Sequence, residues 1–455
     1  MQHQTARAAL RSASAQTAPL VITPTLPPVS GRDEQGVNRR LGLFLGALGS
    51  GGAPIRILRL VRDSLVREWE GRLDELSSRE SQYWGLAVDI RLIARRSRAE
   101  TFLSHYVRGI TDAAQQPDFF PFGGPQAVQA IAAELDRCAG IVFVHRLPAM
   151  AAVLQTRRRP ARLFFDLDDV EHRMRLRQAL QRPIWPGKLL YAAHAPALLR
   201  AEQRGAAISR ATFVCSDRDR AHLARLGVRR VASLPNAVRF PATVPPLADA
   251  PTILYLGVMS YAPNIAAAER LARRIMPLVW QAAPRARLLV AGDGSRELPS
   301  ATGGDPRVEY LGYVPDLDAL YARARLVCCP ITNGGGTRIK LIEAAAYGRA
   351  MVATRIGAEG LAFKNNAEIL LRDDDAGLAE ACVRLLADDA ACAAIGRAAN
   401  ARALALYDSS HIQGKIRTIF APMGTQTAPA PALARYPRPL AARGAAERNI
   451  IELAR

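Results

Sequence analysis

The stretch LVCCPITNGGGTRIKLIEAAAYG, Leu326 to Gly348, joins an apolar run, a loop with three glycines and an amphipathic segment. The run Leu326–Cys329 predicts a buried strand that stops before a proline, and Arg338–Tyr347 predicts a helix. Glycine lets a backbone approach a ligand closely and adopt positive φ. A strand, a glycine loop and a helix in this order are typical of doubly wound α/β domains, which bind ligands at such loops.

Two cations begin the predicted helix, where the helix dipole disfavours them unless an anion is bound. Arg338 and Lys340, with the backbone N–H groups of Gly336 and Thr337, therefore predict a phosphate site. The alternative is a plain turn with two solvated basic residues, because no Walker pattern GxxxxGK[ST] occurs. Glu343 follows on the same helix. Its carboxylate either pairs with one of the cations or accepts hydrogen bonds from ribose hydroxyls, and the second option would describe a nucleotide diphosphate.

Short apolar runs alternate with helical patterns from about residue 20 to residue 420, which predicts βα units and parallel sheets. Before the proline-rich segment 240–251, strands are expected at Leu20–Thr23, Ile55–Leu60, Val88–Ile93, Ile141–His145, Leu163–Leu167, Thr212–Cys215 and Val231–Leu234. After it they are expected at Ile253–Leu256, Leu288–Ala291, Val308–Tyr310, Leu326–Cys329, Met351–Thr354 and Ile369–Leu371.

These patterns predict an α/β chain with two Rossmann-like doubly wound domains facing each other across a cleft. The expected segments are a disordered N-terminal stretch 1–18, a first domain 19–240, a linker 241–251, a second domain 252–421 and a C-terminal tail 422–455.

Composition narrows the class of protein only moderately. The 455 residues are 49% hydrophobic and 22% charged, which is typical of a globular protein, and the net charge of +20 favours an anionic partner. Nearly all of that charge is arginine, so a compositional bias explains part of it. The six cysteines show no zinc-ligand spacing, no apolar run is long enough to span a membrane, and no secretory signal is evident. We therefore expect a cytoplasmic protein, with peripheral contact at the inner face of the membrane as an option.

The second half resembles the donor-binding domain of the family-4 retaining glycosyltransferases of the GT-B fold (group 1 glycosyl transferases). The resemblance rests on ILYLGVMSYAPNIAAAERL (253–271), LLVAGDGS (288–295), VEYLGYVPDLDALYARARLVCCP (308–330) and GGGTRIKLIEAAAYGRAMVATRIGAEGL (334–361). SLPNAV (233–238) resembles the Pro-Asn hinge motif of that family, whereas residues 18–232 resemble its acceptor half more loosely.

The resemblance implies roles for individual residues. Arg338 and Lys340 would hold the diphosphate of a nucleotide sugar and stabilise the leaving group, and Glu343 would read the ribose. The remaining donor contacts that it implies are Gly257, Asn264, Tyr313, Gly335, Gly336 and Thr337. One departure concerns Gly335, where the family has the first of its two glutamates, which contacts the transferred sugar. The turn after Leu256 also lacks the family's arginine and lysine, so more of the diphosphate charge would fall on Arg338 and Lys340.

In the first domain, Ser30 and Gly31 follow the first strand and are expected on the acceptor side of the cleft. His145 ends a strand, where ligand-facing side chains belong, and the resemblance matches it to a catalytic histidine near the sugar. A structural role for His145 is the alternative. The cluster DLDDVEH (166–172) fits no Ca²⁺ loop, and capping of the next helix by its acids is the commoner explanation.

The resemblance implies a metal-independent enzyme, with no cofactor, that transfers a sugar with retention from a nucleotide-diphosphate sugar to a glycan or lipid-linked acceptor. Polysaccharide or glycoconjugate biosynthesis at the cell surface is the expected context. Arginine runs in the first domain would suit anionic lipid headgroups or would simply be solvated, and nothing indicates nucleic-acid binding. The alternatives are a catalytically inactive nucleotide-sugar binding protein of the same fold and a nucleotide-sugar epimerase.

Overall fold

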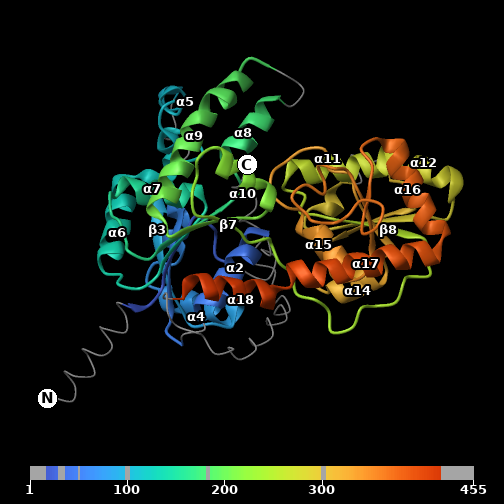
Figure 1. Ribbon diagram of the computed structural model, residues 1–455, viewed down its shortest axis with the longest axis horizontal. Coiled ribbons are helices and arrows are strands. Elements are labelled where there is room, and N and C mark those ends of the chain that lie inside the picture. The colour runs from blue at the N-terminus through green and yellow to red at the C-terminus, as the bar shows by residue number, and fades with distance from the viewer. Residues whose placement is uncertain are drawn as a thin grey trace.

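The computed structural model describes residues 17–28, 36–49, 52–97, 103–180, 185–298 and 304–421. Two α/β domains form the two lobes in Figure 1, and each is built around one parallel sheet. The first sheet has the strand order β3-β2-β1-β4-β5-β6-β7, and the second has the order β10-β9-β8-β11-β12-β13. In each sheet the order changes direction once, between β1 and β4 and between β8 and β11. The predicted pair of doubly wound domains is confirmed.

The strands coincide with the apolar runs of the sequence, because strands of a parallel sheet are covered on both faces. The first sheet contains β1 (Leu20–Thr23), β2 (Ile55–Arg62), β3 (Val88–Arg95), β4 (Val142–His145), β5 (Leu163–Asp168), β6 (Ala211–Val214) and β7 (Val231–Ser233). The second contains β8 (Thr252–Leu256), β9 (Arg287–Ala291), β10 (Val308–Gly312), β11 (Leu326–Cys329), β12 (Ala350–Ala353) and β13 (Leu370–Leu371).

Helices cover both faces of each sheet. The first domain has α2 (Gly36–Leu48), α3 (Asp63–Glu68), α4 (Leu73–Trp84), α5 (Leu103–Arg108), η3 (Ala113–Gln115), η4 (Phe120–Gly123), α6 (Pro125–Asp136), α7 (Leu147–Gln155), α8 (Glu171–Leu180), α9 (Lys188–Ile208) and α10 (Asp217–Arg225). The later helices are α11 (Ala262–Arg270), η5 (Leu271–Ile275), α12 (Met276–Ala282), η6 (Ser295–Glu297), α14 (Leu317–Ala322), α15 (Ile339–Ala346), α16 (Asp375–Ala387), α17 (Asp389–Tyr407) and α18 (Ser409–Phe420). None of the helices in these described ranges is long and apolar enough to cross a membrane.

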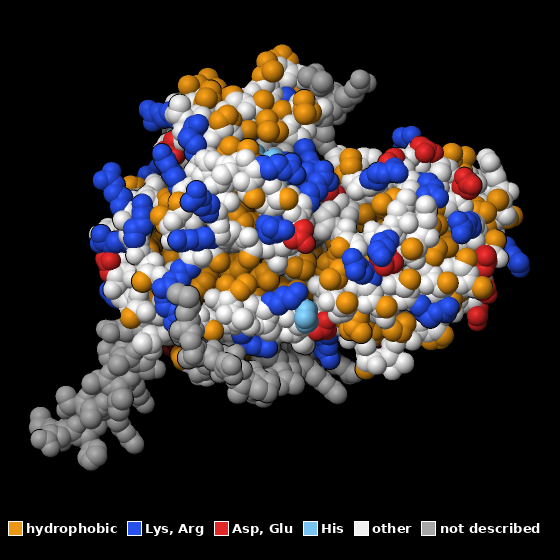
Figure 2. All heavy atoms as spheres, viewed as in Figure 1, with side chains coloured by type: hydrophobic (Ala, Val, Ile, Leu, Met, Phe, Trp, Pro, Cys, Tyr) orange, Lys and Arg blue, Asp and Glu red, His pale blue; other side chains and the backbone are white. Residues whose placement is uncertain are grey.

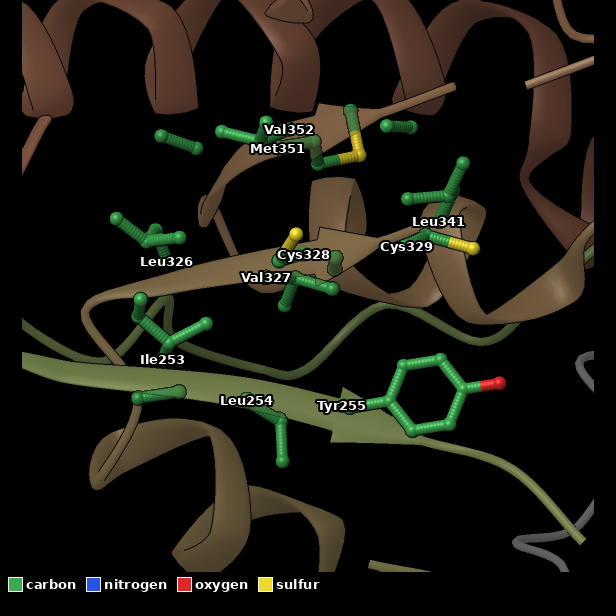
Figure 3. Close-up of a cluster of buried hydrophobic side chains, with 14 of the residues drawn as sticks. Ile253, Leu254, Tyr255, Leu326, Val327, Cys328, Cys329, Leu341, Met351 and Val352 are labelled. Carbon is green, nitrogen blue, oxygen red and sulfur yellow. The ribbon is translucent and has the colours of Figure 1, made fainter. Parts of the chain in front are cut away.

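The second domain has one continuous apolar core around β8, β11 and β12. Figure 3 shows Ile253, Val327 and Val352 on these three neighbouring strands. Tyr255 belongs to the same core and is fully buried, yet its hydroxyl points beyond the end of its strand in Figure 3. The core therefore places one polar atom at the carboxyl edge of the sheet, under the glycine loop.

The last described helix, α18, falls within the predicted second domain, 252–421, but belongs structurally to the first. It packs against α2 of the first domain, and Ile412, Ile416 and Phe420 belong to a first-domain core. The ring of Phe420 lies 4.6 Å from that of Phe164 in β5. Figure 1 shows α18 under the first lobe, beside α2 and α4. Its position in the sequence suggested the second domain, but its packing is on the first.

Two segments of chain cross between the domains side by side. Val238, which precedes the linker, forms a parallel bridge with Asp408, which precedes α18. The two crossings bring the Pro-Asn segment 235–236 to the cleft and join the domains at one place.

Candidate functional site

The glycine loop lies at the carboxyl edge of the second sheet, together with other predicted donor contacts. Gly257 follows β8, Tyr313 follows β10, and the loop 330–338 follows β11. Because β8 and β11 flank the point where the strand order changes direction, this edge is where open parallel sheets bind their ligands. Tyr313 is partly buried, and its role beside a nucleobase stays a prediction.

The three glycines of the loop differ in what they require. Gly334 and Gly336 have φ values of 105° and 70°, which residues with a Cβ atom rarely adopt. A Cβ atom on Gly336 would also lie 2.7 Å from an oxygen of Asp169. Gly335 has no such backbone constraint, and its nearest neighbour would be the sulfur of Met174 at 3.3 Å. Glycine is therefore required at 334 and 336 by the backbone, but at 335 only by close neighbours.

Arg338 is folded back onto its own loop. Its Nη1 donates to the carbonyl oxygens of Gly335 and Gly336, the latter at 2.6 Å, and the side chain is buried. The loop carbonyls thus compensate a cation that the sequence placed at a helix N-terminus, so an anion is not needed to explain its position. The arginine holds the carbonyls on one side of the loop, and its predicted direct contact with a diphosphate stays a prediction.

The start of α15 offers unused backbone donors. Within the described residues, no acceptor pairs with the N–H groups of Gly336, Thr337 or Arg338. The first N–H groups of a helix have no partner inside the helix, and the helix dipole adds positive potential there. These N–H groups are the ones that the sequence assigned to a phosphate site, and that role stays a prediction.

Lys340 lies beside two other predicted donor contacts, Asn264 and Gly257. Its Nζ donates to Oδ1 of Asn264 at 2.8 Å and lies 3.2 Å from the hydroxyl of Tyr255. A Cβ atom on Gly257 would lie only 2.8 Å from the same Nζ, so glycine leaves room for the amine at the end of β8. Burial lowers the pKa of Lys340 to about 8. A desolvated cation at this edge would gain from an anionic ligand.

Glu343 pairs neither with Arg338 nor with Lys340. Its carboxylate forms an ion pair with Arg39 of α2, across the cleft, and its side chain is buried. The simple ion-pair alternative was therefore right in kind but wrong in partner, because sequence spacing identifies only neighbours on the same helix. A ribose contact of Glu343 would share the carboxylate with Arg39 and stays a prediction.

Asp169, in the first domain, faces the glycine loop across the cleft. It follows β5, and its carboxylate oxygens lie 2.7 Å and 3.6 Å from the Cβ positions built on Gly336 and Gly335. Within the described residues it has no hydrogen bond or ion pair. Burial, and then the negative charge of Asp168, raise the pKa of Asp169 to about 7. A carboxyl group thus lies next to Gly335, where the resembled family has a glutamate.

The cleft beside this loop is nearly closed. The cavity lined by Asp169, Met174 and Gly335 holds about 30 Å³, which is room for about one water molecule. Nδ2 of Asn236 donates to Oγ1 of Thr337 at 2.8 Å and ties the Pro-Asn segment to the loop.

An acidic residue of the second domain reinforces the closure. Glu359 forms ion pairs with Arg173, Arg177 and Arg218 of the first domain. Burial opposes ionisation of Glu359, but the hydrogen bond from Arg177 and the nearby positive charges hold its pKa below the ordinary value. Sequence analysis missed this contact, although IGAEGL contains Glu359 and the arginine-rich stretch 173–182 contains Arg173 and Arg177.

His145 does not reach the cleft. Its ring is fully buried, with Nδ1 3.0 Å from Oγ1 of Thr23 and Nε2 3.7 Å from a carboxylate oxygen of Asp166. Burial lowers its pKa to about 3, so the imidazole is neutral. The expectation of a ligand-facing ring at this strand end differs from the structure, because a strand end on the inner side of the sheet is covered by α2. Its catalytic role stays a prediction.

A buried ion-pair network surrounds His145. The guanidinium of Arg40 donates to both oxygens of Asp166, at 2.8 Å and 2.5 Å, and lies 3.2 Å from Asp168. Asp168 also accepts from the thiol of Cys215 at 3.0 Å. Asp166 and Asp168 of DLDDVEH thus belong to the ion-pair network under the cleft. Asp169 alone among these aspartates faces the glycine loop.

The residue after His145 is strained. Arg146 has φ 70° and ψ 153°, a region that is almost reserved for glycine and costs other residues about 1–3 kcal/mol. It lines a larger cavity of about 400 Å³ at the carboxyl edge of the first sheet. Sequence analysis assigned no role to this arginine, because backbone strain leaves no signal in a single sequence.

The predicted acceptor-side residues Ser30 and Gly31 lie outside the described residues. The described ranges contain no group of three or more His, Cys, Asp or Glu side chains that could hold a metal ion. Figure 2 shows many Lys and Arg side chains over the first domain, on the face drawn there.

Comparisons with known proteins give one family match and a shared fold. Residues 250–388 match the family model described as glycosyl transferases group 1. None of the curated proteins compared has a significant sequence match to the chain.

Solved structures share the fold at low sequence identity. TarM aligns with a TM-score of 0.62 and 11% identity over 89% of this chain and 98% of its own. Sucrose-phosphate synthase from Thermosynechococcus elongatus gives 0.61 and 17%, with the same coverage of 89% and 98%. Anabaena Alr3699/HepE in complex with UDP and glucose gives 0.57 and 12% over 88% and 98%.

A second TarM structure shows a more local likeness. A point mutant of S. aureus TarM in complex with fondaparinux, alpha-GlcNAc-glycerol and UDP aligns over 65% of this chain and 59% of that one, with a TM-score of 0.52 and 14% identity. The fold shared with these proteins is the GT-B fold, in which two Rossmann-like domains face each other. The family model thus matches a stretch within the second domain, whereas the GT-B fold shared with the solved structures extends over both domains.

Proposed function

We propose that this protein transfers a sugar, with retention of anomeric configuration, from a nucleotide-diphosphate sugar to a glycan or lipid-linked acceptor. One observation carries the proposal: Lys340, Gly257 and the unpaired N–H groups of α15 meet at the point where the second sheet changes direction. HepE was solved with UDP and glucose and the TarM mutant with UDP, which supports a nucleotide sugar as the donor.

The arrangement suits a diphosphate more than a neutral ligand. Backbone N–H groups at a helix start bind phosphate oxygens, and the amine of Lys340 adds a charge from the side of β8. Arg338 keeps the loop carbonyls turned away from that position. The proposed site therefore uses protein groups for the positive charge that a metal ion would otherwise supply.

The proposed reaction breaks the bond between the anomeric carbon and the β-phosphate oxygen, and the electron pair goes to that oxygen. The hydroxyl oxygen of the acceptor forms the new bond to the anomeric carbon on the same face. Its proton passes to the departing phosphate. Because negative charge grows on the diphosphate, the α15 donors and Lys340 lower the barrier electrostatically.

Asp169 supplies the acidic group that position 335 lacks. Its carboxyl faces Gly335 and Gly336 and would accept a hydrogen bond from a hydroxyl of the transferred sugar. A glutamate at position 335 would place a second carboxylate against Asp169, and like charges at such distances repel. Gly335 and Asp169 are thus complementary, and the absence of the glutamate does not argue for an inactive protein.

The rival that an observation favours is an inactive nucleotide-sugar binder. The cleft beside the glycine loop has a volume of only about 30 Å³, and Glu343 is already paired with Arg39. A transferase of this fold must open the cleft, whereas a binder has no need of an acceptor path. The epimerase alternative has no observation of its own here.

The test uses purified full-length protein with UDP-glucose and GDP-mannose. We expect slow release of UDP or GDP by hydrolysis, with a free sugar of retained anomeric configuration detected by NMR. The Asp169→Asn variant should bind UDP as the wild type does and release it at least tenfold more slowly, because the loss concerns the sugar and not the nucleotide. Asp217, an exposed acid at the start of α10, provides the control variant Asp217→Asn.

Each outcome separates the candidates. UDP binding without release from any nucleotide sugar would favour the inactive binder. Release of a free epimer would favour the epimerase, and an inverted anomer would refute retention. Equal release by wild type and Asp169→Asn would remove Asp169 from the proposed mechanism. We further propose a cytoplasmic site of action in the biosynthesis of cell-surface polysaccharides or glycoconjugates.

A further inference from the structure

A cavity among the described residues lies at the carboxyl edge of the first sheet, opposite the donor site. Its volume is about 400 Å³, within the range of cavities that hold small ligands. Thr25 follows β1 and Arg146 follows β4, the two strands between which the first sheet changes direction. This is the point at which an open parallel sheet binds its ligand, so both domains present a site at equivalent positions.

Arg146 is the central polar residue of the cavity. Its Nε is buried and has no acceptor within the described residues. The nearest carboxylates, of Asp168 and Glu171, lie 4.0 Å and 3.9 Å from its nitrogens, beyond hydrogen-bond distance. The backbone of Arg146 is held in a conformation that arginine avoids. A strained, half-buried arginine with a buried, unused Nε donor is typical of a residue that is positioned for a ligand.

Two further arginines line the same cavity. Arg175 donates from Nη2 to Asp118 at 2.7 Å, but its Nε is also buried without an acceptor in the described part of the chain. The guanidinium of Arg95 lies 5.1 Å from the ring centroid of Phe122. The lining contains three arginines and two carboxylates, Asp118 and Glu171, and Asp168 lies 4.0 Å from Arg146 behind it. Burial raises the pKa of Glu171 to about 6.

Apolar side chains form the rest of the wall. Phe119, Phe122 and Leu26 line the cavity beside the arginines. Aromatic rings suit the apolar face of a sugar ring, and they would serve a neutral sugar equally well. A neutral sugar would not, however, use the charge of three arginines or explain the unused Nε donors. Guanidinium groups match carboxylate and phosphate oxygens in geometry and charge.

The cavity adjoins the glycine loop through α8. Glu171, Met174, Arg175 and Gln178 recur at helical spacing and face the large cavity. Arg173, Met174 and Arg177 line the small cavity beside Gly335. Met174 belongs to both linings, so a ligand in the large cavity would lie next to the expected position of the transferred sugar.

We propose that this cavity binds the acceptor through an anionic group, a carboxylate or a phosphate, held by Arg146 with Arg175 and Arg95. The inference rests on the proposed function, because only a transferase needs an acceptor here. It narrows the acceptor to an acidic sugar, a sugar phosphate or a phosphate presented by a lipid.

The experiment compares soluble probes in titration calorimetry with the full chain saturated with UDP. D-glucuronate and α-D-glucose 1-phosphate carry the anionic group, and methyl α-D-glucoside lacks it. We expect the anionic probes to bind the wild type and to bind Arg146→Gln at least tenfold more weakly, because charge-assisted hydrogen bonds are lost. Arg158→Gln is the matched control, since Arg158 is an exposed arginine of the same domain paired with Asp136. Arg146→Lys keeps the charge without the planar fork and should bind with intermediate affinity.

A second arm tests a phosphate on a lipid. Wild type, Arg146→Gln and Arg158→Gln are sedimented with phosphatidylcholine vesicles with and without phosphatidic acid. Both variants lose one positive charge, so nonspecific attraction to the vesicles falls equally. Selective loss for Arg146→Gln, in either arm, supports the proposal and identifies the source of the phosphate.

Three results would overturn the proposal: equal binding by Arg146→Gln and Arg158→Gln in both arms, binding of the neutral glucoside as tightly as the anionic probes, or no binding of any anionic probe to the wild type. UDP binding by each variant shows that it is folded. Failure of the wild type to bind UDP would count against the proposed function, independently of the acceptor probes.

Discussion

The carboxyl edges of the two sheets lie on opposite sides of one cleft, but they are built in different ways. The edge of the second sheet is mostly backbone: glycines with positive φ, helix N–H groups, and an arginine that bonds to carbonyls within five residues of itself. The edge of the first sheet consists mostly of side chains. Arg40 pairs there with Asp166, which lies 126 residues further along the chain. A local motif can be read from one sequence, whereas a network assembled over such distances cannot.

The first prediction concerns the buried network and has the largest expected effect. Arg40→Met should lower the free energy of unfolding by about 3–5 kcal/mol, because it leaves Asp166 buried without its partner. Urea unfolding at pH 7 followed by tryptophan fluorescence measures the change. The signal is dominated by the first domain, which contains Trp69, Trp84 and Trp185, while Trp280 lies in the second.

A double variant makes this prediction specific. Arg40→Met with Asp166→Asn removes both charges and should be more stable than Arg40→Met alone. A loss below about 1 kcal/mol in the single variant, or no recovery in the double variant, would contradict the view that the first edge depends on this ion pair.

The contrast between the two edges also explains which features of the structure could be predicted from the sequence. The strands of the described residues lie where the apolar runs indicated, because a buried parallel strand must be apolar on both faces. The helical segment from α11 to α12 is interrupted by the π turn η5, which Pro277 follows, because proline has no backbone N–H to continue the helical ladder.

Partners across the cleft were harder to predict than elements. Glu343 was expected to pair on its own helix or to bind ribose, and it pairs with Arg39 of the other domain. Asp169 was interpreted as a helix cap and faces the glycine loop. In both cases spacing along the chain describes only local neighbours, and the packing of one domain on the other decides the contact.

The second prediction tests whether the edge of the second sheet depends on backbone conformation. Gly336→Ala should weaken UDP binding by about tenfold, because a left-handed conformation costs a residue with a Cβ atom about 1–2 kcal/mol. Gly335→Ala is the matched control in the same loop and should change the affinity less than about threefold. Its Cβ atom would lie 3.3 Å from the flexible side chain of Met174 and 3.6 Å from an oxygen of Asp169, without a positive φ. Equal losses in the two variants would show that the loop is sensitive to any side chain and not to φ.

The third prediction has a similar or smaller expected effect. It concerns Lys340, a charged side chain at the carboxyl edge of the second sheet with a shifted pKa. Burial lowers the pKa of Lys340 to about 8, so the free protein loses this proton as the pH rises through that value. A diphosphate beside the amine favours its charged form, so the complex keeps the proton. By linkage, the affinity for UDP must therefore fall as the pH rises, by about tenfold between pH 7 and pH 9. Calorimetry in buffers of different ionisation enthalpy should show uptake of close to one proton at pH 9. Lys340→Arg remains charged over this range and should flatten the profile. A pH-independent affinity in the wild type would mean that the amine stays with Asn264 and Tyr255, and that the backbone of α15 alone holds the phosphate.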